Sequence, residues 1–206
     1  MSTTTGQKEA GMARNVKPPE ERKREIVEMA KKLFAEQGYE KTQINDITNA
    51  LNVSHGLVYH YFKSKSEVFD AVIDSLLEYG SNAVLNVVED TSLNPEEKFR
   101  KWFSLANEQP VDMARILDDI LGNNEMLDRI ALRKVETFAP LMEKLIKEGC
   151  EKGYFNCKYP KLAASFCMYG GLGMKNHTQD TGMEVLTDFL NDMYSRVLGI
   201  NKAVIV

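Results

Sequence analysis

The stretch from residue 42 to residue 65, TQINDITNALNVSHGLVYHYFKSK, constrains the fold more than any other part of the chain. Its first half carries apolar residues at helical spacing, and this pattern breaks at Asn52. A second apolar stripe, which includes Val58, begins after Ser54. Thr42 and Ser54 are suited to cap the two helices. Two short helices joined by a tight turn predict a helix-turn-helix, whose second helix can enter the major groove of DNA.

The charge of the chain is unevenly distributed. The 206 residues carry a net charge of −4, yet residues 1–65 hold 11 basic and 8 acidic residues. The remainder holds 15 basic and 22 acidic residues. A mildly basic first third on an acidic remainder is compatible with a local DNA-binding domain, although this asymmetry alone decides nothing.

The sequence predicts neither export nor a metal site. No apolar run approaches the roughly 18 residues that a membrane span needs, and the first residues contain no apolar signal segment, so we expect a cytoplasmic protein. The three cysteines, Cys150, Cys157 and Cys167, lack CxxC spacing. We therefore expect reduced thiols, with no metal and no other cofactor.

Helical periodicity covers most of the chain, and no alternating strand pattern of useful length occurs. The predicted fold is all-α with about nine helices. Residues 1–19 are polar and end in two prolines, so we expect a disordered arm there. Residues 20–64 form the expected three-helix domain, and residues 65–206 form a larger helical domain. The sequence from Ser64 to Glu67 is a capping box that opens a long helix.

Residues 22–70 resemble the DNA-binding part of the TetR family of bacterial transcriptional repressors. The similarity lies in a first helix that ends LFAEQGYEKTQINDI and in the later segment NVSHGLVYHYFKSKSEVF. The run from Gly56 to Phe62, with the following Lys63–Lys65, is its most characteristic part. Beyond about residue 75 the chain resembles the family only in the number and length of its helices. The resemblance implies a ligand-released repressor that binds a palindromic operator as a homodimer.

The resemblance also implies which residues contact DNA. The candidates are Thr42, Ser54, Tyr59, His60 and Lys65 for phosphates, His55 and Gly56 for base edges, and their neighbours Leu57 and Tyr61. Serine at a helix start, tyrosine and lysine are suitable phosphate donors, and glycine lets the backbone approach closely. Leu57 stands where a polar residue is common in the family, but it could contact a thymine methyl group. Tyr59 and Tyr61 could instead be packing aromatics, and His60 an ordinary surface residue.

The larger domain would hold a ligand and a partner subunit. By the resemblance, a pocket for a small apolar inducer would be lined by Phe99, Trp102, Phe103, Met113, Met126, Phe138, Met142 and Phe166. Such residues are also typical of a plain core. The last two helices are apolar on more than one face, so they would either complete a monomer core or pair across a two-fold axis. The expected interface residues are Phe166, Tyr169, Gly170, Gly171, Leu186, Phe189, Leu190 and Met193.

The inducer would act by population shift, moving the two DNA-binding domains apart through the helix from Ser64 to Glu89. Two other functions compete with this hypothesis. An enzyme lacks support, because the sequence shows no paired nucleophile and base and no metal-ligand spacing. A helical interaction module that has lost DNA binding is the other alternative, and Leu57 is the residue that favours it.

Overall fold

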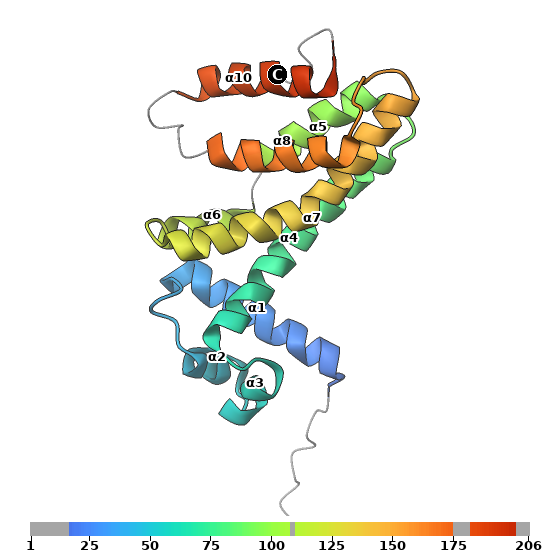
Figure 1. Ribbon diagram of the computed structural model, residues 1–206. Coiled ribbons are helices and arrows are strands. Elements are labelled where there is room, and N and C mark those ends of the chain that lie inside the picture. The colour runs from blue at the N-terminus through green and yellow to red at the C-terminus, as the bar shows by residue number, and fades with distance from the viewer. Residues whose placement is uncertain (1–16, 108–109, 175–181, 201–206) are drawn as a thin grey trace, which may run out of the picture.

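The computed structural model describes residues 17–107, 110–174 and 182–200. Across these residues there are nine helices and no strand, which confirms the predicted all-α fold (Figure 1). The helices are α1 (Pro19–Gln37), α2 (Ile44–Leu51), α3 (His55–Tyr61), α4 (Lys65–Glu89), α5 (Pro95–Asn107), α6 (Val111–Asp119), α7 (Asn124–Glu151), α8 (Pro160–Met174) and α10 (Met183–Leu198). Most of the expected disordered arm lies outside the described residues. The proposed domain boundary after residue 64 stays a prediction.

We call α1–α3 the head and α4–α10 the body. α1 begins with Pro19, which needs no hydrogen-bond partner in the first turn, and continues with Glu20 and Glu21 at the positive end of the helix dipole. Its buried face consists of Ile26, Val27, Ala30 and Phe34. It ends at Gly38, whose φ of 90° is rarely open to residues with a side chain.

α4 connects the head with the body. The Ser64 hydroxyl accepts a hydrogen bond of 3.1 Å from the backbone N of Glu67, as the predicted capping box requires. The Glu67 carboxylate accepts in return from the backbone N of Lys63, at 2.7 Å. The helix has 25 residues and is therefore about 37 Å long. It packs on α1 near its start and on α5 and α7 further along (Figure 1).

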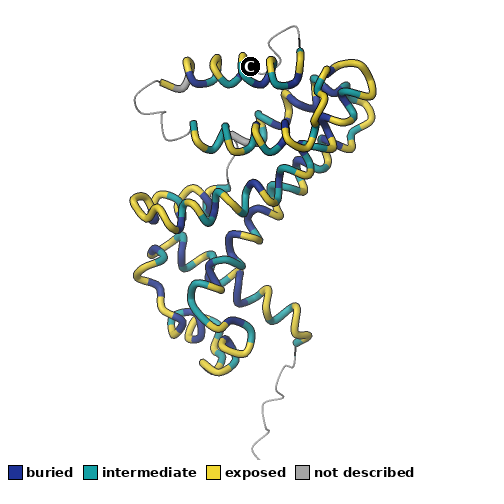
Figure 2. Tube along the Cα trace, in the orientation of Figure 1, coloured by how far each residue is buried: buried dark blue, intermediate teal, exposed yellow. Residues whose placement is uncertain are grey.

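One continuous cluster of buried side chains extends from the head into the body, and buried positions follow α4 and α7 (Figure 2). The Phe69 ring, near the start of α4, lies 6.0 Å from the Phe34 ring and 4.9 Å from the Tyr39 ring, centre to centre. Farther along the body, the Phe99 ring lies 6.0 Å from the Phe155 ring. The head thus shares a core with α4, so burial of apolar surface stabilises both parts together.

α8 and α10 form the layer farthest from the head (Figure 1). A Cβ on Gly171 would lie 2.7 Å from the hydroxyl oxygen of Tyr194, so a larger residue would push the two helices apart. The Tyr194 hydroxyl donates a hydrogen bond of 3.1 Å to the carbonyl of Cys167. The glycine at position 171 therefore permits a close approach of α8 and α10 within the chain, whereas Gly170 faces open space.

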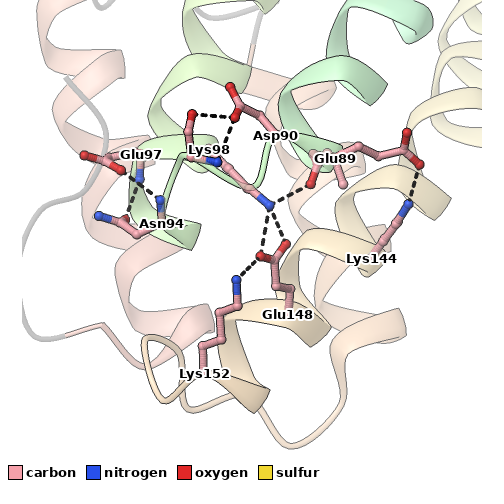
Figure 3. A network of polar contacts seen from close by, with 10 residues as sticks. Glu89, Asp90, Asn94, Glu97, Lys98, Lys144, Glu148 and Lys152 are labelled. Atoms are coloured by element: carbon pink, nitrogen blue, oxygen red, sulfur yellow. Dashed lines mark hydrogen bonds and ion pairs between the residues drawn. The ribbon is translucent and has the colours of Figure 1, made fainter.

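A buried lysine joins α5 to α4 and α7. The Lys98 ammonium donates to the carbonyl of Val88 at 2.7 Å and to the two carboxylate oxygens of Glu148 at 2.9 and 2.8 Å (Figure 3). Only 3 % of the Lys98 side chain is exposed, whereas 22 % of the Glu148 side chain is exposed. Lys152 also donates to Glu148, at 2.6 Å. A charge this deeply buried is stable only because every one of its donors has a partner.

Candidate nucleic-acid interface

The predicted helix-turn-helix is present, with a turn of three residues between α2 and α3. The backbone N of Asn52 bonds to the carbonyl of Asn49, and the backbone N of Val53 bonds to the carbonyl of Thr48. Asn52 adopts a left-handed conformation with a φ of 52°, which asparagine tolerates better than most residues. This residue reverses the chain and allows α3 to cross α2.

α3 presents a polar, exposed face beside a buried one. Val58 is fully buried, and Phe62, which follows the helix, is 4 % exposed. The exposed residues are Ser54, His55, Gly56, Tyr59 and His60. Ser54 occupies the N-cap position without a side-chain capping bond, so its hydroxyl can bind a partner. A Cβ at Gly56 would meet no atom within 4 Å, so the backbone there is open to close approach.

The two tyrosines of α3 occupy different environments. The Tyr59 side chain is 44 % exposed, and its ring lies 4.7 Å from the His55 ring, centre to centre. Tyr61 is half-buried and packs against the core, with its ring 5.2 Å from that of His60. Tyr59 is therefore available to a partner, whereas Tyr61 fits the alternative of a packing aromatic. Leu57, between these residues, is partly exposed.

Thr42 does not have the role that the sequence predicted. The N-cap of α2 is Gln43, and the Asp46 carboxylate accepts a hydrogen bond of 2.7 Å from the backbone N of Gln43. Thr42 itself is fully buried, and its hydroxyl donates to the carbonyl of Gly38 at 2.7 Å. Because no part of Thr42 reaches the surface, its prediction as a helix cap and phosphate contact is wrong. It holds the turn between α1 and α2.

Lys65 is likewise used inside the head. Its ammonium donates to the carbonyls of Tyr39 at 2.9 Å and Glu40 at 3.3 Å, and lies 4.2 Å from the centre of the Tyr39 ring. Two of its three N–H groups are thus occupied by the turn after α1, and the ring provides a further attraction. This side chain is a fixed structural contact, not the free phosphate donor that the sequence predicted.

Two lysines that the sequence reasoning did not select lie beside the end of α3. Lys63 is exposed directly after the helix. Lys23, on α1, is exposed, and its ammonium lies 5.8 Å from the centre of the Phe62 ring. The basic run from Arg22 to Arg24 was visible in the sequence, but only the packing of α1 on the rest of the head brings it near α3.

The residues predicted to line a ligand pocket mostly fill the core. Phe99, Trp102, Met113, Met126, Phe138 and Met142 are buried, and Phe103 is half-buried. Phe166 is 55 % exposed on α8, and its assignment to a pocket stays a prediction. Two cavities are found elsewhere, one of about 560 Å³ between α1 and α2 and one of about 410 Å³ between α1, α4 and the start of α6. The predicted residues border neither cavity, and the pocket stays a prediction.

The last two helices expose several large apolar residues. On α8 these are Leu162, Phe166 and Tyr169, and on α10 they are Val185 and Phe189. Leu186 is 6 % exposed and faces the interior, so its assignment to an interface is wrong. Leu190 and Met193 are half-buried. Exposed apolar side chains on two neighbouring helices are typical of a surface that another subunit covers.

The cysteines are thiols. The Cys150 thiol donates to the carbonyl of Cys157 at 3.5 Å, and burial raises the pKa of the Cys167 thiol to about 12. In the part of the chain that the structure describes, no cluster of three or more His, Cys, Asp or Glu side chains could hold a metal ion. No helix in the same part is long and apolar enough to cross a membrane.

The head carries a short, exposed third helix, and a long helix joins the head to a larger body. This arrangement places the structure in the class of helix-turn-helix proteins. Residues 26–72 match the family model described as bacterial regulatory proteins, tetR family. This segment includes most of α1, all of α2 and α3, and the start of α4. This match identifies the head and the start of α4 as a TetR-family DNA-binding segment, as the sequence predicted.

Two similar proteins are named as HTH-type transcriptional repressors. The transcriptional repressor KstR2 of Mycobacterium tuberculosis (strain CDC 1551 / Oshkosh) is 32 % identical over 82 residues, which are 40 % of each chain. The match thus spans less than half the length of this relative. The repressor DhaR of Mycobacterium sp. (strain GP1) is 24 % identical over 179 residues, covering 84 % of this chain and 90 % of DhaR.

Solved structures share the fold. A TetR/AcrR-family regulator from Thermobifida fusca is 20 % identical, with a TM-score of 0.59, and the alignment covers 88 % of this chain and 99 % of that one. RolR in complex with resorcinol is 21 % identical, with a TM-score of 0.65, and the alignment covers 88 % of this chain and 89 % of RolR. At these identities the likeness concerns the fold alone.

Proposed function

We propose that the protein is a transcriptional repressor that binds operator DNA through the exposed face of α3. The observation that carries this proposal is the exposure of Ser54, His55, Gly56, Tyr59 and His60 around a buried Val58. The packing of α3 on the head fixes this face, and a helix of this size fits the major groove. Relatives named as repressors support the direction of regulation.

The protein would act as a homodimer on a palindromic operator. A single head can read only one half-site, so two heads must be held about one helical turn of DNA apart. The exposed apolar residues of α8 and α10, such as Phe166 and Phe189, lie in the layer farthest from the head and suit this role. Pairing them across a two-fold axis would give a four-helix bundle and leave both α3 faces free.

A small molecule would control the repressor by binding in the body. RolR, which shares the fold, was solved in complex with the ligand resorcinol, and this supports control by a small molecule. We further propose that the protein works in the cytoplasm, where its DNA lies, and that it has no enzymatic activity. The relatives are named as regulators, and this supports the latter point.

The test begins with a DNA sequence selected in vitro by the unmodified protein. Replacing Tyr59 with Phe should weaken binding to the selected site and to random DNA by a similar factor of about 5 to 10, because one hydrogen bond to phosphate is lost. Tyr61→Phe is the matched control and should have little effect, since that ring packs against the core. His55→Ala should instead change which base is preferred at one position.

Affinity should also fall steeply with salt, because phosphate contacts release counterions. Two results would refute the proposal. One is failure of the unmodified protein to enrich any sequence over random DNA. The other is an equal effect of the Tyr59 and Tyr61 changes, since the two side chains differ in exposure and the proposal assigns the DNA contact to Tyr59 alone.

A further inference from the structure

The segment after α7 folds back along the last turn of that helix. The backbone N atoms of Tyr154 and Phe155 both donate to the carbonyl of Gly149, at 2.8 and 3.0 Å. The Phe155 ring is buried and lies against Gly149, where it leaves no room for a Cβ. Gly153 supplies the positive φ of 75° in this reversal. The chain therefore returns beside the end of α7, where Cys150 lies.

This reversal brings Cys150 and Cys157 together. The Cys150 thiol donates a hydrogen bond of 3.5 Å to the carbonyl oxygen of Cys157, and both residues are partly exposed. A carbonyl oxygen lies about 2.4 Å from the Cα of its residue, so the Cys150 sulfur lies within about 6 Å of the Cys157 Cα. In a disulfide the two Cα atoms are about 4.4 to 6.8 Å apart, so rotation of the two side chains with a small backbone shift can close the bond.

The segment that carries Cys157 is held from its other side by the end of α10. The backbone N of Asn156 donates to the carbonyl of Leu198, the last residue of α10, at 2.8 Å. A Cβ at Gly199 would lie 2.6 Å from the carbonyl oxygen of Asn156, so the two segments are in close contact. Asn156 and Lys158, on either side of Cys157, are exposed. Cys157 therefore stays beside Cys150, at a place that a small solute can reach.

The third cysteine lies in a different environment. Cys167, on α8, is only 2 % exposed. Burial, with a smaller contribution from the nearby Cys157, raises the pKa of the Cys167 thiol to about 12. Because the thiolate is the form that reacts with oxidants, a buried thiol that stays protonated is inert. Of the three cysteines, Cys150 and Cys157 are therefore the two that are placed to react with each other.

We propose that Cys150 and Cys157 form a reversible disulfide when the protein is exposed to a peroxide. The Cys157 thiolate attacks the peroxide, so that an S–O bond forms while the O–O bond breaks, and an alcohol or water leaves. The Cys150 thiolate then attacks the sulfur of the resulting sulfenic acid, and its hydroxide leaves as water. Each thiol proton ends on a leaving oxygen, and the two electrons lost by the sulfur atoms reduce the peroxide.

This modification site does not depend on the proposed DNA binding. In reducing compartments disulfides are transient and usually serve catalysis or redox sensing, so a pair of this kind would report on oxidants. Because Asn156, next to Cys157, is bonded to the end of α10, the disulfide would fix the junction of α7, α8 and α10.

The test treats the unmodified protein with a small molar excess of hydrogen peroxide, alkylates the remaining thiols and digests the chain with trypsin in the absence of reductant. Trypsin cleaves after Lys152, so Cys150 and Cys157 fall in separate peptides, residues 148–152 and 153–158. We expect these two peptides to be joined, with a mass two hydrogens below their sum. Two of the three thiols per chain should be lost, and dithiothreitol should restore both.

Two variants serve as controls. Cys167→Ala should give the same joined peptides, because the buried thiol takes no part. Cys150→Ser, at a partly exposed position, should form no disulfide, and Cys157 should instead be labelled by dimedone, which reacts with sulfenic acids.

Three results with the unmodified protein would overturn the proposal. They are three free thiols after peroxide treatment, a disulfide that joins Cys157 to Cys167, and a disulfide between two chains, seen as a dimer on a non-reducing gel. None of them bears on whether the protein selects DNA, so this proposal and the proposed function fail independently.

Discussion

Replacing Glu148 with Gln should destabilise the protein more than replacing its partner Lys98 with Met. In the glutamine variant the Lys98 ammonium stays buried, with the carbonyl of Val88 and a neutral amide as its remaining acceptors. Leaving a buried charge without its counter-charge costs about 3 kcal/mol of unfolding free energy, at the lower end of the usual range because an acceptor remains.

The methionine variant removes the charge and keeps most of the apolar stem. The Glu148 carboxylate remains paired with Lys152 and is partly exposed, so it tolerates the loss. The carbonyl of Val88 loses its donor, which costs about 1 to 2 kcal/mol. The double variant should resemble Lys98→Met, because the buried charge is absent from both. A double-mutant cycle should therefore give a coupling energy of about 2 to 3 kcal/mol.

Urea unfolding followed by far-UV circular dichroism at a fixed protein concentration measures these differences. Glu89→Gln is the matched control, since the exposed pair of Glu89 and Lys144 joins the same two helices. It should cost only about 0.2 to 1 kcal/mol. The reasoning is refuted if Glu148→Gln costs no more than this control, or if Lys98→Met is the more damaging of the two changes.

Two further predictions concern pH and assembly. Burial acts to raise the pKa of Glu148, but hydrogen bonds from Lys152 and Lys98 outweigh it and lower that pKa. The carboxylate thus stabilises the fold above its ordinary pKa of about 4.3, and this contribution is lost as the pH falls through the lower pKa of the folded state. The difference in unfolding free energy between the unmodified protein and Glu148→Gln should therefore shrink below about pH 4.3, as measured by urea titrations. Phe166→Glu should raise the dissociation constant of the proposed dimer about 100-fold in sedimentation experiments. Leu132→Glu, at an exposed leucine of α7, should not, and equal values for both would argue against the α8–α10 interface.

Much of the fold could be predicted from the sequence, because its signals are local. The break at Asn52, the capping box at Ser64 and the proline that opens α5 each act within a few residues of a helix end. The exposed face of α3 was also predictable, since Val58 and Phe62 had to face inward, which leaves Tyr59 and His60 facing out.

The errors have a common cause. Thr42, Lys65 and Leu186 have the residue type that their predicted roles require, but the packing of the folded chain decides whether each side chain is exposed and free to bind. The Thr42 hydroxyl is buried and donates to the carbonyl of Gly38. The Lys65 ammonium donates to the carbonyl of Tyr39, 26 residues earlier, and Leu186 is buried on α10. Residue type defines what a side chain can bind, but not whether that capacity is already used.

The sequence by itself determined that this chain forms helices, where most of them begin and end, and which short helix exposes hydrogen-bond donors. Hydrogen bonding within helices and the spacing of apolar residues are sufficient for that. The tertiary structure alone decided which donors stay free and how the body touches the head. Asp119 and Tyr39 are 80 residues apart, and only the packing of α6 on α1 brings that carboxylate within hydrogen-bonding distance of the backbone N of Tyr39.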